Sequence, residues 1–349
     1  MGSAHTVVVF GAYGHTGRFV VAELRDRGFV PVLSGRDAGK LKELAASAPG
    51  SDVRPASAGD PAALDRALTG ATAVINCAGP FATTAAPVIE AALRAGIPYV
   101  DVTGEIEAGI DTFTHFADRA RAARAVIVPA MAFYGGLGDL MTTAAMGDWT
   151  AADEAHIAYA LSSWHPTAGT RATSAVSRQR RGGRRLRYTR GRLESHHDAL
   201  PTLRWPFPEP VGPRDVIGEF TTVDVVTVPR HLGVPEVCTY MTVEATGEVL
   251  APDTPEPVAA DESGRSAQTF LVDVVVRSGG SERRAVARGR DIYAVTAPLA
   301  VEAVDRILAG RTKTVGVASA GEIFDAPDFL RALSPHLSVE LLPQRASFT

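Results

Sequence analysis

A glycine-rich turn near the start of the chain limits the possible folds more than any other feature. The stretch Thr6–Phe10 is a short, continuous apolar run, typical of a strand buried on both faces of a parallel sheet. Three glycines follow at a spacing of three, Gly11, Gly14 and Gly17, and an amphipathic stretch to about Arg27 comes next. Backbone N–H groups at such a helix N-terminus bind a pyrophosphate, whose approach side chains would block. The order of strand, turn and helix therefore predicts a dinucleotide-binding unit, with a merely structural turn as the alternative.

The first third of the chain continues to alternate between strand and helix patterns. Five more apolar runs predict strands, at about 30–34, 53–57, 73–76, 99–102 and 126–130. Helical patterns of about ten to twenty residues separate most of them. We therefore expect an α/β fold, in which βαβ units build the doubly wound parallel sheet of a Rossmann domain.

After about Asp148 the pattern changes to one of a second, α+β domain. Two segments alternate between apolar and polar residues, 221–226 and 269–276, and loops rich in proline and glycine, such as 205–210, separate such segments. This predicts a mainly antiparallel sheet. We expect a helix at 296–308 with Thr296 as its N-cap, a helix near 326–333 and a tail strand at 338–341.

The predicted domains are a Rossmann domain at 1–145, completed by 296–349, and a substrate or dimerisation domain at 146–295. The stretch 251–266 is expected to be an exposed loop.

The end of the second strand distinguishes between the two nicotinamide cofactors. An acidic residue at this place would bind a free ribose 2′-hydroxyl, whereas an arginine accommodates a 2′-phosphate. The strand ends in Ser34, Gly35 and Arg36, and Lys40 lies one helical turn further on. Two cations favour NADP(H), although Arg36 as a solvated charge and Asp37 as the acidic residue stay open alternatives.

Further candidate cofactor contacts lie where later strands end, because Rossmann ligands bind at the carboxyl ends of the strands. Asp60 is placed to face the adenine, and helix capping explains it equally well. Cys77 fits a small packed residue better than a nucleophile. The full set of expected cofactor-binding residues is Gly11, Tyr13, Gly14, His15, Thr16, Gly17, Ser34, Arg36, Lys40, Asp60, Cys77, Ala78, Gly79, Pro80, Phe81, Thr103, Gly104 and Glu105.

Three motifs give the chain a resemblance to a known family. They are the segments 11–18, 76–81 and 99–105, and the likeness extends to Gly135–Asp139. In these motifs the sequence resembles the saccharopine dehydrogenase-like oxidoreductases, which include trans-acting enoyl reductases. The resemblance covers about the first 140 residues and is looser beyond them. It implies a Rossmann domain, use of NADPH, a second domain that closes over the nicotinamide, and reduction of C=N or C=C bonds. It also implies that 79–81 and 103–105 border cofactor and substrate.

The scarcity of lysine departs from the family pattern. Lysine-handling members are thought to use a lysine as acid and base near the substrate, but this chain has only Lys40, Lys42 and Lys313. No Tyr-x-x-x-Lys motif occurs either. The sequence therefore argues against saccharopine chemistry itself and against the short-chain dehydrogenase mechanism.

Reduction of an imine or an activated alkene still requires a proton donor. Tyr134 is the first candidate, because it follows the sixth strand at the sheet edge where ligands gather; an aromatic filling the domain hinge is the alternative. His165 lies in a loop before a helix and titrates near neutrality, with a surface histidine as its alternative. His231 is a weaker candidate, and Asp139 fits a helix cap better than an acid or base.

An arginine-rich segment is the last notable feature. Residues 178–192 contain eight arginines around a Gly-Gly pair. The segment is either a solvated, mobile hairpin or a site for an acidic partner, such as a carboxylate substrate or a carrier protein. Nucleic acid is not expected, because Tyr188 alone interleaves the arginines.

Composition excludes several other classes. The net charge of −4 is too mild to suggest nucleic-acid binding, and two unpaired cysteines predict neither disulfides nor a zinc site, so no metal is expected. Residues 1–6 lack the basic and apolar regions of a signal peptide, and no apolar run approaches a membrane span. We therefore expect a cytoplasmic protein without membrane partners, and a homodimer is among the open possibilities.

Two functions remain open from the sequence. The first is an NADPH-dependent reductase of an imine or enoyl group on a small metabolite or a carrier-tethered intermediate. The second is a non-catalytic NADP(H)-sensing protein that keeps the Rossmann site but performs no turnover.

Overall fold

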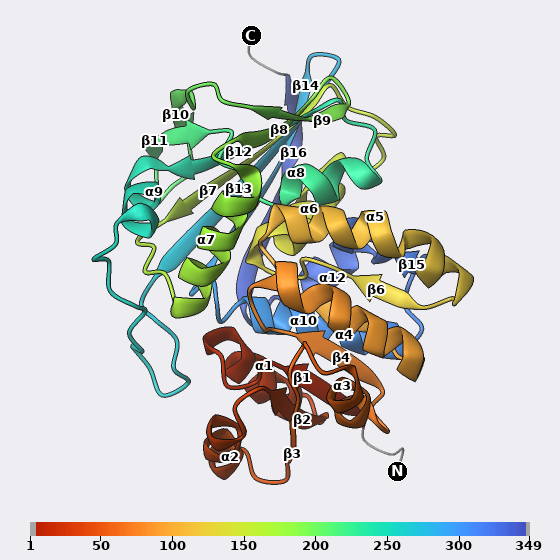
Figure 1. Cartoon of the computed structure of the whole chain (residues 1–349). Coiled ribbons are helices and arrows are strands. Elements are labelled where there is room, and N and C mark those ends of the chain that lie inside the picture. The colour runs from red at the N-terminus through yellow and green to blue at the C-terminus, as the bar shows by residue number, and fades with distance from the viewer. Residues whose placement is uncertain (1–4, 347–349) are drawn as a thin grey trace.

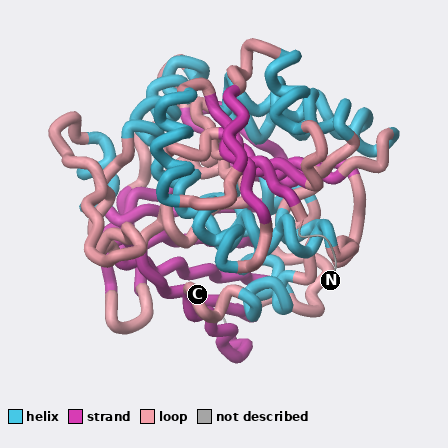
Figure 2. Tube along the Cα trace, turned by 90° about the horizontal axis from the view of Figure 1, so that it is seen from below, coloured by secondary structure: helices cyan, strands magenta, loops and turns pink. Residues whose placement is uncertain are grey.

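Two sheets organise the computed structural model, which describes residues 5–346. The first is an all-parallel sheet of seven strands in the order β15-β6-β5-β4-β1-β2-β3. Figure 1 shows it with its helices in the lower part of the molecule, and Figure 2 shows helices on both of its sides. Its strands are β1 (Thr6–Phe10), β2 (Val30–Gly35), β3 (Asp52–Pro55), β4 (Ala73–Asn76), β5 (Tyr99–Asp101), β6 (Val126–Val128) and β15 (Gly316–Val317). The predicted doubly wound parallel sheet is confirmed.

Helices cover both faces of this sheet because both faces are apolar. Helices α3, α4 and α5 cover one face, and α1, α2 and α10 cover the other. Their bounds are α1 (His15–Asp26), α2 (Ala38–Ser47), α3 (Pro61–Leu68), α4 (Phe81–Ala95), α5 (Ile106–Ala122) and α10 (Thr296–Leu308). Pro61 is the first residue of α3, and α4 ends at Gly96, whose φ of +67° suits a left-handed helix cap.

The second sheet is mixed but mainly antiparallel. Its strand order is β10-β11-β12-β7-β13-β14-β16, and the hairpin β8–β9 pairs with β12. Within the described part of this second sheet, β7–β12 is the one parallel pair. The strands are β7 (Glu154–Leu161), β8 (Arg185–Thr189), β9 (Arg192–His196), β10 (Thr202–Pro206), β11 (Pro213–Gly218), β12 (Glu236–Thr242), β13 (Thr269–Ser278), β14 (Ser281–Arg290) and β16 (Leu337–Ala346). The predicted second sheet is confirmed.

Short helices and turns join the two sheets. A π-turn, η1 (Phe133–Leu137), and α6 (Gly138–Met146) leave the parallel sheet after β6. The remaining elements are α7 (Ala168–Arg181), α8 (Asp224–Thr227), η2 (Val228–Arg230), α9 (Val243–Leu250), α11 (Ala320–Ile323) and α12 (Ala326–Ala332).

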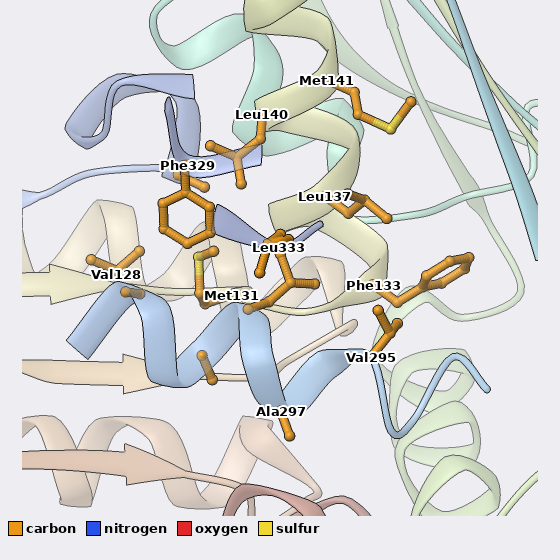
Figure 3. Close-up of a cluster of buried hydrophobic side chains, with 14 of the residues drawn as sticks. Val128, Met131, Phe133, Leu137, Leu140, Met141, Val295, Ala297, Phe329 and Leu333 are labelled. Carbon is orange, nitrogen blue, oxygen red and sulfur yellow. The ribbon is translucent and has the colours of Figure 1, made fainter. Parts of the chain in front are cut away.

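One continuous apolar cluster runs from the parallel sheet into the second sheet. It passes through α6, whose Leu140 and Met141 are fully buried, and through α12 with Phe329. Figure 3 shows Leu140 and Phe329 gathered with Met131 and Leu333, while Met141 points to the other side of α6. Because the core is shared, the two sheets pack as one body around α6.

The structure corrects four expectations. The segment 221–226 is not a strand: nearly all of it is buried and it leads into α8, because the carboxylate of Asp224 pairs inside the protein. Thr296 begins α10 but does not cap it, since its hydroxyl donates to Ile292 O. Part of the expected loop 205–210 belongs to β10, where Trp205 is buried.

The fourth correction concerns the C-terminal return to the Rossmann domain. Helix α10 and β15 do return to it, but β16, which contains the expected tail strand 338–341, pairs with β14 in the second sheet. The domain boundaries themselves stay a prediction. Residues 1–4, on which part of the signal-peptide prediction rests, lie outside the described residues. Within residues 5–346, no helix combines the length and the apolar character that crossing a membrane requires.

Candidate functional site

The glycine turn between β1 and α1 has the shape that a phosphate-binding turn needs. Gly11 has a φ of +87°, and a Cβ there would lie 2.8 Å from Ala78 N at the end of β4. At Gly17 a Cβ would overlap Gly11 O, so only glycine lets α1 start so close to the strand. At Gly14 the nearest atom to a Cβ, Gly11 O, is 3.2 Å away. Close contacts within the protein therefore explain Gly11 and Gly17, whereas the contact at Gly14 is looser and its N–H donates to Gly11 O at 3.0 Å.

The N-terminus of α1 differs from those of the next three helices. Asp37 caps α2 by accepting from Lys40 N at 3.1 Å, and Asp60 caps α3 by accepting from Ala63 N at 3.0 Å. Glu105 accepts the first N–H groups of α4. The N-cap of α1 is Gly14, which has no side chain to cap the helix. Since uncapped N–H groups attract anions, this turn suits a pyrophosphate.

The end of β2 carries exposed positive charge. Arg36 and Lys40 are exposed, and neither forms an ion pair within residues 5–346. The Lys40 ammonium lies 5.8 Å from the ring centre of Tyr13, which lies two positions after Gly11. Asp37 is engaged as a helix cap, so its carboxylate is not free to hold a ribose hydroxyl. The buried Ser34 hydroxyl has no partner within the described residues. These residues fit a 2′-phosphate, and NADP(H) is therefore the cofactor that suits the site.

A chain of hydrogen bonds fixes the loops after β4, β5 and β6. Ala78 N donates to Asn76 Oδ1, Asn76 Nδ2 donates to Tyr99 Oη, and Tyr99 Oη donates to Asp101 Oδ2. Asp101 Oδ1 in turn accepts from Ala130 N at 2.8 Å. Burial raises the pKa of Asp101 to about 6, and the N–H donors counteract part of this rise. The network thus links the loops after β4, β5 and β6 to one another.

Glu105 fixes the loop that contains Gly79 and Pro80. Its Oε1 accepts from Phe81 N at 2.6 Å and its Oε2 from Ala82 N at 2.9 Å. Burial raises the pKa of Glu105 despite these two donors. The expected cofactor contact of this residue stays a prediction, and the structure shows that it also caps α4. Burial raises the pKa of the Cys77 thiol as well, so this thiol stays protonated, as a packed residue would.

Tyr134 lies in the most unusual backbone of the site. Ala130 has a φ of +58° and Gly135 a φ of +92°, with η1 between β6 and α6. Backbone of this kind is often found at functional sites. The Tyr134 hydroxyl is buried without a hydrogen-bond partner among the described residues, and burial raises its pKa well above the ordinary value. The phenol is therefore protonated at neutral pH and available as a donor.

Helix α7, which belongs to the part of the molecule with the second sheet, lies against the loop after β4. A Cβ on Gly79 would lie 2.7 Å from Thr173 Cγ2 of α7. The helix is attached to α5 by ion pairs of Arg180 with Asp111 and of Arg181 with Glu107. Its position brings the second half of the molecule against the expected nicotinamide side of the site, as Figure 1 also indicates.

Tyr293 connects this helix to the glycine turn, and the sequence analysis did not single it out. Its hydroxyl bonds Thr170 Oγ1 at 2.9 Å and donates to His165 O at 3.3 Å, and its ring lies edge-on to His15 at 5.2 Å. Burial lowers the pKa of His15, whose imidazole is thus neutral at pH 7. The His165 imidazole itself makes no hydrogen bond within residues 5–346. Asp224 and Tyr159, which contact the Tyr134 segment, were also missed.

The other candidates are distant or structural. His231 Nε2 lies 2.7 Å from Asp139 Oδ1, and Asp139 Oδ2 accepts from Gly321 N, so this pair ties η2 to α6 and α11. Asp139 is therefore not the cap of α6 that the sequence suggested. The described residues contain no group of three or more side chains that could hold a metal.

The arginine-rich segment forms the end of α7 and the start of the β8–β9 hairpin. Five of its eight arginines are in ion pairs, with Glu107, Asp111, Glu194, Asp198 and Glu219 as the acidic partners. The expected solvated hairpin therefore describes only part of the segment, because five of its arginines form ion pairs with other side chains. Arg178, Arg184 and Arg185 are exposed and have no ion pair within residues 5–346.

Comparisons with known proteins agree with this geometry. Residues 7–129 match the family of saccharopine dehydrogenase NADP-binding domains. A probable mitochondrial saccharopine dehydrogenase-like oxidoreductase of Arabidopsis thaliana is 31% identical over 144 residues, which cover 37% of this chain and 32% of that protein. A saccharopine dehydrogenase-like oxidoreductase of Homo sapiens is 32% identical over 117 residues, which cover 28% of this chain and 27% of that protein. The chain thus matches about a third or less of the length of these curated relatives.

The whole fold has a counterpart among solved structures. Apo saccharopine dehydrogenase (L-Glu forming) from Saccharomyces cerevisiae aligns with a TM-score of 0.67 over 97% of this chain and 100% of that chain. The two chains are 12% identical, so this likeness shows a shared fold alone. The resemblance stated from the three sequence motifs is confirmed.

Proposed function

We propose that the protein is an NADPH-dependent oxidoreductase, because residues 7–129 match the family of saccharopine dehydrogenase NADP-binding domains. It reduces a C=N (imine) or a C=C (enoyl) bond of a small metabolite or a carrier-tethered intermediate. The observation that carries the proposal is the meeting of this domain with a buried, unpartnered Tyr134 hydroxyl at the carboxyl ends of its strands.

The chain's own residues would bind and orient the cofactor. The glycine turn and the uncapped α1 would hold the pyrophosphate, and Arg36 and Lys40 the 2′-phosphate. When bound, NADPH supplies the hydride. The network through Asn76, Tyr99 and Asp101 keeps the loops at this edge in place, so that binding does not have to order them.

A reduction also needs a proton, and Tyr134 is the better of the two donors that the sequence proposed. Its hydroxyl is buried and keeps its proton at neutral pH, so it can donate a hydrogen bond to a substrate atom and pass on the proton as negative charge develops there. His165 is partly exposed and its imidazole is not held by a hydrogen bond within the described residues. It is the second candidate, since α7, which follows it, covers Gly79.

The test is spectroscopic and separates the two open functions. Candidate cyclic imines and enones are added to the protein with NADPH, and loss of the NADPH absorbance band is followed. Turnover that falls in Tyr134→Phe but not in Tyr188→Phe supports the proposal. Tight NADPH binding without turnover of any candidate would instead favour the NADP(H)-sensing protein.

Substrate, partners and location are parts of the same proposal. We expect a small-molecule substrate, acidic or carrier-tethered, with Arg178, Arg184 and Arg185 exposed for its acidic part. A homodimer and a cytoplasmic location stay predictions. Fractionation tests the location, since one relative is named a probable mitochondrial protein and another, from Caenorhabditis elegans, a lipid droplet localized protein.

A further inference from the structure

The backbone around Tyr134 is held by side chains from distant parts of the chain. Asp101 of β5 accepts from Ala130 N, and Thr296 Oγ1 of α10 accepts from Phe133 N at 3.2 Å. Asp224 Oδ1 of α8 accepts from Gly135 N at 3.2 Å. Conformations with positive φ persist where the surroundings enforce them. Of these three supports, Asp224 lies on the second-sheet side of the segment and has no role in the cofactor site.

Asp224 is fully buried and its carboxylate reaches two parts of the Tyr134 surroundings. Besides Gly135 N, Oδ1 accepts the hydroxyl of Tyr159 at 3.0 Å. Gly138 completes the arrangement, because a Cβ there would overlap Asp224 Oδ1 and lie 2.8 Å from Tyr159 Oη. A charged residue at such a depth is costly unless its contacts are needed. These contacts therefore indicate that Asp224 holds the segment around Gly135 and Tyr159 in place.

Tyr159 carries the effect of Asp224 to the Tyr134 ring. The two rings have centroids 5.0 Å apart and cross at 66°. On another side Trp164 packs against Tyr134 at 5.4 Å. The hydrogen bond between Asp224 and Tyr159 thus fixes the Tyr159 ring, which packs against the Tyr134 ring. Gly135, the residue after Tyr134, donates its N–H to the same carboxylate. Asp224 Oδ1 is thus the one of these supports that acts on both the backbone next to Tyr134 and a ring packed against it.

We propose that Asp224, acting through Tyr159 and Gly135 N, is a positioning residue that holds the Tyr134 hydroxyl where it can donate its proton. This inference rests on the proposed function, in which Tyr134 is the donor. An asparagine keeps the acceptor oxygen in place, whereas an alanine removes it and leaves the Tyr159 hydroxyl unpaired. Asp224→Asn should therefore preserve the arrangement and Asp224→Ala should release it.

The first experiment needs no turnover. The full-length protein, which has seven tyrosines, is labelled with 3-fluorotyrosine, and the ¹⁹F resonance missing in Tyr134→Phe is assigned to Tyr134. In Asp224→Ala this resonance should shift or broaden, and in Asp224→Asn it should stay near its original position. Tyr159→Phe, which removes one hydroxyl, should also shift it and serves where the alanine variant does not fold. An unmoved resonance in folded Asp224→Ala or Tyr159→Phe overturns the inference.

Asp273 supplies the matched control. It is also fully buried, but it binds Trp205 Nε1 and Arg284, and it points to the other face of the second sheet from the neighbouring Val272 and Val274. Asp273→Ala should lower the melting temperature without moving the Tyr134 resonance. A shift as large as that in Asp224→Ala would show a general loosening and would overturn the specific role of Asp224.

The second experiment measures turnover with a substrate found by the NADPH assay. Asp224→Ala should lower kcat about 100-fold, as expected for a donor displaced by about 1 Å, with the KM for NADPH unchanged. Asp224→Asn should remain within a few-fold of the wild-type kcat. Equal losses in both variants overturn the inference. If the wild-type protein turns over no substrate while the ¹⁹F result holds, the proposed function fails and the structural positioning of Tyr134 by Asp224 stands.

Discussion

The two sides of the candidate site are built in different ways. The dinucleotide side consists of consecutive residues, since the glycine turn, the end of β2 and the caps of α2 and α3 all lie within the first seventy positions. The Tyr134 side is assembled from segments far apart: Tyr159 and Asp224 are 65 positions apart, and Phe133 and Thr296 are 163 apart. A local motif can be recognised in a sequence, whereas a contact between distant segments exists only once the chain has folded.

A substitution in the glycine turn should have the largest effect. In Gly11→Ala the new Cβ meets Ala78 at 2.8 Å and also requires a φ of +87°. We expect unfolding to become easier by about 2–4 kcal/mol from strain and overpacking together, and NADPH affinity to fall about 100-fold. Thermal unfolding and fluorescence titration with NADPH measure the two effects.

Gly28→Ala is the matched control for this prediction. Gly28 has a φ of +80° but no atom within 4 Å of a Cβ, so it carries the strain without the overlap. It should cost about 1–2 kcal/mol and leave NADPH affinity unchanged. Equal losses of affinity in the two variants would contradict the local explanation of the turn.

The pH dependence of stability tests the Tyr134 side of the site, through the buried Asp224. Burial raises the pKa of Asp224 to about 6, against about 4 in an unfolded chain. The folded state therefore favours the protonated acid. The stabilisation that the protonated Asp224 gives to the folded state is present below about pH 4 and is lost as the pH rises through 6. Asp224→Asn should gain stability relative to the wild type over that range, by about 3 kcal/mol. Urea unfolding between pH 4 and 7 measures the difference.

Glu90 provides a control of opposite sign. A hydrogen bond from Arg119 lowers the pKa of Glu90, so its contribution is present above the unfolded pKa and is lost as the pH falls. Glu90→Gln should therefore lose stability relative to the wild type as the pH rises through about 4. The same slope in both variants would contradict the burial of the Asp224 charge as the cause.

Cofactor choice should respond to a substitution of Arg36. Removing a charge-assisted contact to the 2′-phosphate costs about 1.5–3 kcal/mol, so Arg36→Asp should weaken NADPH binding about 10- to 100-fold. NADH, which lacks this phosphate, should be affected far less. Arg66→Asp, at an exposed position on α3, is the control. Equal weakening of NADPH and NADH by Arg36→Asp would refute the assignment of the 2′-phosphate site.

The smallest expected effect concerns the pair that ties η2 to α6. Burial lowers the pKa of His231, but the Asp139 carboxylate at 2.7 Å outweighs it and the pKa is raised. Its stabilisation is present below the unfolded pKa and is lost as the pH rises through the folded pKa. His231→Gln should remove about 1 kcal/mol at pH 6 and less at pH 8. A loss that does not change with pH would mean that packing rather than charge is removed.

The fold class followed from the sequence because its main signals are short-range. Apolar runs, capping residues such as Asp60 and the glycine spacing act within a few positions. The errors came where tertiary contacts override such signals. Alternation at 221–226 suggested a strand, but Asp224 turns inward to bind Gly135 N and Tyr159. The tail strand joined the second sheet because β14 offered an edge to pair with.

The sequence by itself determined the parallel sheet, the glycine turn and the basic end of β2, since each depends on neighbours in the chain. It also named Tyr134 as a candidate, from its place after the sixth strand. Only the tertiary structure decided what surrounds Tyr134. The buried Asp224, the Tyr159 hydroxyl and the position of Tyr293 against His15 depend on packing between segments whose separation along the chain leaves no local signal.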